Sequence, residues 1–238
     1  MKRRMDFIML GTLSLLSAGS IEPGLVAAVG AYNARGAEQV RITWATAPAT
    51  RKRIASGDVF DIVIAPDHTV DECSQQQKVA GDRRVPVGRV GVGVVARSDV
   101  DVPDISSVDA LKQAVLNAES VVFNRASGGL YVETLLKKLG LYEWIQEKTK
   151  RFDDGPAMMA HLINGKGREI GFGAIIEILM FRDQGLKLAS PLPPDVQHWT
   201  AYVAVPMVAA PNAAGAQSFL HYLGTAPAKA LFAAHGIE

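Results

Sequence analysis

Strands and helices alternate along the first part of this chain, and that alternation constrains its fold more than any other feature. Apolar runs predict strands over residues 7–18, 39–45 and 59–66, and the segments between them predict helices over residues 21–36 and 48–57. The third run is almost wholly apolar, which is typical of a central strand covered on both faces. Three β-α units in succession predict an α/β fold with a parallel sheet and right-handed crossovers.

The character of the sequence changes at residue 84, where a long extended run rich in valine and glycine begins. A second long β run covers residues 199–210, and two helices close the chain. Between the two runs the sequence predicts strands over 120–124, 168–173 and 186–192, and helices over 107–118, 129–141, 156–165 and 175–185. A second α/β lobe is therefore expected to be inserted into the first.

The two extended runs would form a two-strand hinge between the lobes, with hinge segments near 84–97 and 198–210. We expect residues 1–86 plus 200–238 to form lobe I and residues 87–199 to form lobe II. A hinged pair of lobes encloses a cleft, and lobe interfaces are where small-ligand sites form.

Composition excludes several function classes. The net charge of +1 leaves no basic surface for nucleic acid, and no apolar run reaches the roughly 18 residues of a membrane-spanning helix. One cysteine, Cys73, excludes an internal disulfide and a cysteine-based metal cluster, and no histidine pair has zinc-helix spacing. The pattern G-x-G-x-x-A at Gly91 and Gly93 is not followed by a helix, so we interpret it as part of the hinge strand. We therefore expect neither a metal nor a cofactor.

The first 20 residues allow two interpretations. Their basic start, apolar middle and small residues at the end fit a short signal peptide. The same apolar segment fits the first strand of the sheet, and the count of β-α repeats favours this second interpretation.

Polar and small residues gather where predicted strands end and helices begin. In open parallel sheets, ligands bind beyond the carboxyl ends of the strands, and helix N-termini there suit anions. Plain helix capping is the alternative for each residue taken alone. The candidate ligand-binding residues of this kind are Ser17, Ser20, Thr46, Ser127, Gly128 and Gly129.

Two charged residues are further candidates. Arg125 directly follows a predicted strand and precedes the glycines, so it could clamp a carboxylate through two hydrogen bonds, or else be a solvated loop residue. Glu177 could enter the cleft from lobe II, or else lie on an exposed helix face.

Five segments in this order resemble the periplasmic substrate-binding proteins of ABC transporters, above all the molybdate-binding type. The segments are LLSAGSIEPGL, IASGDVFDIVIAP, SGGLYVETLLKKLGL, LASPLPPDVQ and FLHYLGTAPAKALFAAHGIE. The resemblance implies a two-lobed type II periplasmic binding protein fold over nearly the whole chain. It also implies that SAGS is the end of the first strand of the mature protein, which favours the strand interpretation.

The resemblance also implies five contacts to an oxyanion, made by hydroxyls and backbone amides. Ser20 and the amide of Gly128 match the family pattern. Thr46 stands where a serine-rich turn is usual, Pro156 has no amide to donate, and Ala174 replaces a tyrosine. These three departures argue against molybdate in particular, and Arg125 favours a carboxylate.

The leading hypothesis is a binding protein that captures a small anion in the interlobe cleft for import through an ABC permease. We expect a monomer that binds no nucleic acid and does not insert into a membrane. The alternative is an isomerase of the aconitate isomerase type, with Glu177 as base, Arg125 holding carboxylates and Ser17 or Ser20 as donors. The resemblance implies a periplasmic location. No separate signal precedes the predicted first strand, so a cytoplasmic location stays open.

Overall fold

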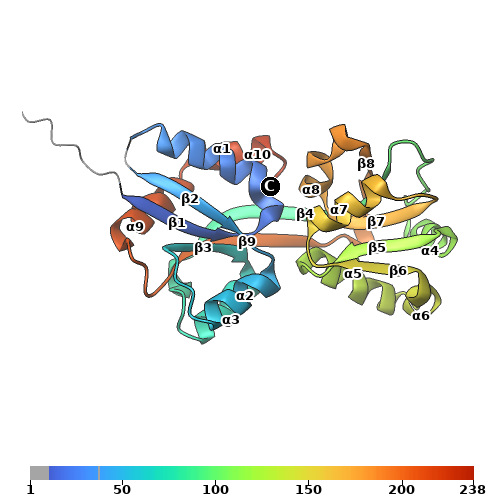
Figure 1. Ribbon diagram of the computed structural model, residues 1–238, viewed down its shortest axis with the longest axis horizontal. Helices are drawn as coiled ribbons and strands as arrows, with labels where there is room; N and C mark the ends of the chain where they lie inside the picture. Colours follow the sequence, from blue (N-terminus) through green and yellow to red (C-terminus); the bar gives the residue numbers. More distant parts are fainter. Residues whose placement is uncertain (1–10, 37) are drawn as a thin grey trace, which may run out of the picture.

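The computed structural model describes residues 11–36 and 38–238, so the predicted strand residues 7–10 lie outside the described part. Two α/β lobes lie side by side, and two long strands run from one lobe into the other (Figure 1). These strands are β4, Val85–Arg97, and β9, Trp199–Pro206. The predicted two-lobed fold with a two-strand connection is therefore present.

The sheet of lobe I begins with three parallel strands, as the β-α repeats predict. Strand β1 pairs in parallel with both β2 and β3, and β3 pairs with β9 in the antiparallel sense. The strand bounds are Thr12–Ser17 for β1, Gln39–Trp44 for β2 and Ile62–Pro66 for β3.

The sheet of lobe II has a parallel part and an antiparallel part. Strand β5 pairs in parallel with β6 and β7, whereas β4 pairs with β7 and β8 in the antiparallel sense. The bounds are Ser120–Asn124 for β5, Thr149–Phe152 for β6, Glu169–Ala174 for β7 and Leu186–Pro191 for β8.

Strand β4 belongs to both sheets, and its partner changes part-way along. Residues up to Gly91 pair with β9 in lobe I, and residues from Val92 pair with β7 in lobe II. A Cβ atom at Gly93 would come within 2.6 Å of Leu188 Cδ1, so glycine lets this side chain pack closely against the strand. The glycine-rich stretch is thus a bent connecting strand, as interpreted from the sequence, and forms no dinucleotide loop.

Helices cover both faces of each sheet. In lobe I, α1, α9 and α10 cover one face and α2 and α3 the other; in lobe II, α4, α5 and α6 cover one face and α7 and α8 the other (Figure 1). The bounds are Glu22–Asn33 (α1), Ala47–Ala55 (α2), Asp67–Gln75 (α3), Val108–Asn117 (α4), Ser127–Lys138 (α5), Tyr142–Ile145 (α6), Gly155–Asn164 (α7), Ile175–Met180 (α8), Ala213–Leu223 (α9) and Ala226–Ala234 (α10).

Alternating side chains of β3 explain why this strand is apolar throughout. Ile62 and Ile64 pack into the core beneath α1, whereas Val63 and Ala65 pack into the core beneath α2 and α3. Because successive strand residues point to opposite faces, a strand with helices on both sides needs apolar residues at every position. The prediction of a central, doubly covered strand is confirmed.

The structure also corrects some predicted boundaries. Helix α8 ends at Met180 and is followed by a 3-10 turn, whereas the sequence predicted a helix to residue 185. Strand β9 ends at Pro206 rather than residue 210. Strand β6 and helix α3 were not predicted, because both segments are mostly polar and lack a long apolar period.

Candidate functional site

A cavity of about 190 Å³ lies where the two lobes meet. Lobe I lines it with residues at or just after the ends of β1, β2 and β3, and lobe II with residues at the starts of α5 and α7 and with Glu177 of α8. The cavity therefore lies at the carboxyl ends of strands from both sheets, where open α/β folds bind ligands.

On the lobe I side, two chain turns bring helix starts to the cavity. After β1 the chain passes through a 3-10 turn, Gly19–Ile21, into α1. After β2, Thr46 caps α2 and its Oγ1 accepts a hydrogen bond from the amide of Ala49 at 3.4 Å. Both helices have a proline in the first turn, where a missing amide leaves no hydrogen bond unmade.

On the lobe II side, α5 begins directly behind the end of β5. Asn124 closes the turn, because its Oδ1 accepts a hydrogen bond from the amide of Ala126 at 3.0 Å. A Cβ at Gly129 would overlap the carbonyl oxygen of Asn124, so only glycine lets α5 start this close to the strand. Helix α7 is capped by Asp154, whose Oδ1 accepts from the amide of Ala157 at 2.9 Å.

Helix starts and hydroxyl groups give this cavity hydrogen-bond donors that suit negative charge. The first amides of an α-helix have no partner within the helix, and the helix dipole adds positive potential there. Hydroxyl-bearing side chains from both lobes, Ser20, Thr46 and Ser127, line the same space. The Oγ of Ser127 is buried and makes no hydrogen bond to any other described residue. It is therefore a donor left over for a bound molecule.

Glu177 lines the cavity and makes a hydrogen bond between the lobes. Its Oε1 accepts a hydrogen bond from Ser20 Oγ at 3.0 Å, which joins lobe II to lobe I, and the residue is 9% exposed. Burial raises the pKa of the Glu177 carboxyl to about 7; the bond from Ser20 acts against this rise, and the nearby Asp154 and Glu22 add to it. Close to neutral pH this carboxyl is therefore near its midpoint of titration.

The remaining charged groups of the cavity are also acidic. Glu22, Asp154 and Glu177 are among its lining residues, and within the described part of the chain no lysine, arginine or histidine lines it. Tyr202 of β9 is buried beside Ser20 and Glu177, and burial raises the pKa of its phenol. An anion here would have to be held by amides and hydroxyls, without a cationic side chain.

Most of the predicted site residues come together in this region. Ser20, Thr46, Ser127 and Glu177 line the main cavity. Gly128 and Gly129 line a narrow adjoining space of about 10 Å³, which shares Ser20, Glu177 and Tyr202 with the main cavity. Whether these residues bind a ligand stays a prediction at this point.

Two predicted residues lie elsewhere. Ser17 is fully buried within β1, and its Oγ contacts the carbonyl oxygen of Ala18 at 3.4 Å. Arg125 is about half exposed and pairs with Asp153 at 2.9 Å, outside the lining of the cavity. Arg125 therefore does not line the cavity, because it extends outward while Asn124 turns the chain into α5, which agrees with the alternative of a solvated loop residue.

Among the lining residues that sequence reasoning missed are Trp44, Asp154 and Tyr202. Trp44 ends β2 and Tyr202 lies within the connecting strand β9, so neither belongs to a strand-to-helix turn. Asp154 could have been found, because an aspartate before Gly155 and Pro156 is a typical helix N-cap pattern.

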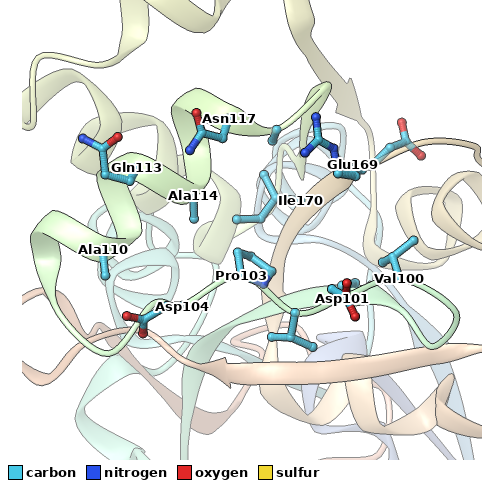
Figure 2. Close-up of a pocket in the computed structure, with 14 residues that line it drawn as sticks. Val100, Asp101, Pro103, Asp104, Ala110, Gln113, Ala114, Asn117, Glu169 and Ile170 are labelled. Carbon is cyan, nitrogen blue, oxygen red and sulfur yellow. The ribbon is translucent and has the colours of Figure 1, made fainter.

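Two larger cavities lie away from the cleft. One, of about 580 Å³, lies in lobe II between α4 and residues 100–104, with Ala114 and Asn117 on one side and Pro103 on the other (Figure 2). It opens at the starts of β5 and β7, the opposite end of these strands from the cleft. The other, of about 860 Å³, lies beside α9 in lobe I. Neither gathers helix starts from both lobes.

Two searches of residues 11–36 and 38–238 gave negative results. No helix there has both the length and the apolar character needed to cross a membrane. The same residues hold no group of three or more histidine, cysteine, aspartate or glutamate side chains arranged to bind a metal ion.

Residues 13–238 match the profile of the bacterial extracellular solute-binding protein family. The chain belongs to this family. Among curated proteins, this solute-binding protein is similar to an aconitate isomerase from a Pseudomonas species, with 26% identity over 223 residues that cover 90% of the chain and 82% of the relative.

Solved structures share the fold of this solute-binding protein. The periplasmic molybdate-binding protein of Azotobacter vinelandii has a TM-score of 0.77 at 16% identity, covering 95% of this chain and 98% of that one. The sulfate-binding protein SubI of Mycobacterium tuberculosis H37Rv has a TM-score of 0.76 at 17% identity, covering 95% and 86%. The fold is therefore that of the two-lobed periplasmic binding proteins.

Proposed function

We propose that this solute-binding protein captures a small anion in the interlobe cavity and delivers it to an ABC permease. The observation that carries this proposal is the convergence of helix starts and hydroxyls from both lobes on one cavity of about 190 Å³. That volume is below the range of about 300–1,000 Å³ that is usual for drug-sized ligands, so the ligand is a small solute.

The buried Ser127 hydroxyl supports the same proposal. A buried polar group without a partner costs about 1–3 kcal/mol, and a ligand oxygen that accepts from Ser127 Oγ would remove this cost. Binding to both lobes at once would favour the closed arrangement, because the ligand makes contacts there that an open form lacks. The family and its structural neighbours support a periplasmic location, and we propose that the protein works there as a monomer.

A thermal-shift panel tests the proposal. Purified protein is heated with molybdate, tungstate, sulfate, phosphate, dicarboxylates or tricarboxylates in turn. A ligand present at about 100 times its dissociation constant adds about 2.7 kcal/mol to stability, which gives a clear rise in Tm. The cavity offers hydrogen-bond donors that both oxyanions and carboxylates can use. The panel separates the two classes of ligand by showing which of them raises the Tm.

Matched variants connect any stabilisation to the cavity. Ser127→Ala and Thr46→Ala should weaken binding of the stabilising anion about tenfold each, since each removes a hydroxyl that lines the cavity. Ser218→Ala, at an exposed position on α9, should bind like the parent protein. Stabilisation by no anion, or equal binding by all three variants, would contradict the proposal.

An isomerase is the second candidate, and two observations favour it. The curated relative from Pseudomonas is an aconitate isomerase, and Glu177 combines a place in the cavity with a pKa of about 7, which suits a general base. Incubation with aconitate in heavy water tests it by proton NMR. Catalysis predicts isomer formation that Glu177→Gln abolishes; a spectrum unchanged over a day removes this candidate.

A further inference from the structure

The charge distribution of the cavity raises a problem for an anion. Three carboxylates, Glu22, Asp154 and Glu177, line it, and within the described residues no cationic side chain does. Asp154 also caps α7, so its oxygen is already used by the amide of Ala157. An ionised Glu177 in contact with an anion would place two like charges together in a space shielded from water, which is unfavourable.

Within the described residues, one side chain donates a hydrogen bond to the Glu177 carboxyl. Ser20 from the turn before α1 donates to Oε1, and Oε2 lies against the Cα of Gly155, where a Cβ would overlap it. Tyr202 of β9 and the acidic Asp154 and Glu22 line the same cavity as Glu177. Because no cationic side chain of the described residues lines the cavity, this carboxyl loses its charge by taking up a proton.

We propose that Glu177 contacts the bound anion through one shared proton, so that each anion is captured together with a proton. This inference rests on the proposed function and adds a specificity rule to it. An anion of a weak acid, which can carry the proton itself, or an anion that accepts a hydrogen bond from protonated Glu177, fits the cavity. An ionised Glu177 facing a fully ionised ligand does not.

The sign of the pH dependence follows from this arrangement. The free protein has Glu177 with a pKa near 7, and a bound anion holds the proton more firmly still. Above pH 7 capture must therefore take a proton from solvent, and affinity should fall by about tenfold per pH unit. Below pH 6 the carboxyl is already protonated and affinity should level off.

Isothermal titration calorimetry tests the proposal directly. Sulfate, molybdate, phosphate and citrate are titrated at pH 8 in two buffers that differ in ionisation enthalpy, which reports the protons taken up per anion. We expect close to one proton for the parent protein and for Glu143→Gln, a change at an exposed position on α6. We expect close to none for Glu177→Gln, with an affinity that varies little between pH 6 and 8. Each variant is first checked for native circular dichroism.

The outcomes separate this inference from the proposed function. Binding of an anion without proton uptake at pH 8 would overturn the inference and leave the anion-binding function standing. Proton uptake that persists in Glu177→Gln with sulfate or molybdate, which carry no proton of their own at pH 8, would also overturn it, because another group of the protein would be titrating. Absence of binding by all four anions at pH 6 and pH 8, together with stabilisation by no anion of the thermal-shift panel, would overturn both.

Discussion

Replacing Glu177 with glutamine should change how the stability of the ligand-free protein depends on pH. In the folded state burial raises the pKa of this carboxyl from 4.5 to about 7. At about 1.4 kcal/mol per pKa unit, the rise corresponds to about 3 kcal/mol of linked stability. The residue is 9% exposed, so solvent screening reduces this figure little.

The sign follows from the protons bound in each state. Below pH 4.5 both states hold the proton, and the protonated carboxyl costs the fold nothing extra. Between pH 4.5 and 7 the unfolded chain releases the proton while the folded protein keeps it, so the free energy of unfolding falls as pH rises. Above pH 7 the loss is complete. Glu177→Gln lacks this titration, so its free energy of unfolding should rise relative to that of the parent protein between pH 4.5 and 7.

Urea unfolding followed by circular dichroism measures the effect. Parent protein and Glu177→Gln are compared at pH 4.5 and pH 8 in a chloride buffer without polyvalent anions. The difference between the two free energies of unfolding should change by about 3 kcal/mol in favour of the variant at pH 8. Glu143→Gln, at an exposed position, should show no such change. A Glu177→Gln difference that stays constant within about 0.5 kcal/mol would refute the reasoning about burial.

Two further changes test packing around the cleft. Gly129→Ala should lower stability by about 1–3 kcal/mol in thermal denaturation, because the new Cβ overlaps the Asn124 carbonyl oxygen. Gly128→Ala should be nearly neutral, since its new Cβ would lie 3.7 Å from Val92 Cγ2. Equal Tm values for the two variants would contradict this prediction. Ile176→Ala should weaken the contact between the lobes, since this α8 side chain packs into the lobe I core, and small-angle X-ray scattering should then report a larger radius of gyration. An unchanged radius would argue that the contact does not hold the lobes together.

The pattern of strands and helices could be predicted because it depends on local chemistry. The almost wholly apolar run in residues 59–66 predicts a strand covered on both faces, and the valine- and glycine-rich run from residue 84 predicts a long extended segment. The polar elements, β6 and α3, escaped because their short apolar stripes do not stand out from loops.

The candidate site was only partly predictable. Ser20, Thr46 and Ser127 follow strands in the sequence, and all three line the cavity because parallel strands end at one edge of a sheet. Arg125 follows a strand equally closely, yet it extends to Asp153 in solvent. The position of a residue in the sequence predicts that it lies in the turn after a strand, and does not predict the direction in which its side chain points.

By itself the sequence determined the α/β lobes, the insertion of one lobe into the other and the turns that carry polar side chains. The tertiary structure alone decided that Glu177 meets Ser20 across the lobes and that Tyr202 closes the cavity from the connecting strand. The physical reason is that periodicity and capping act between residues near one another in the chain. Burial, and the raised pKa that follows from it, depends on elements more than 150 residues apart, such as Ser20 and Glu177 with a sequence separation of 157.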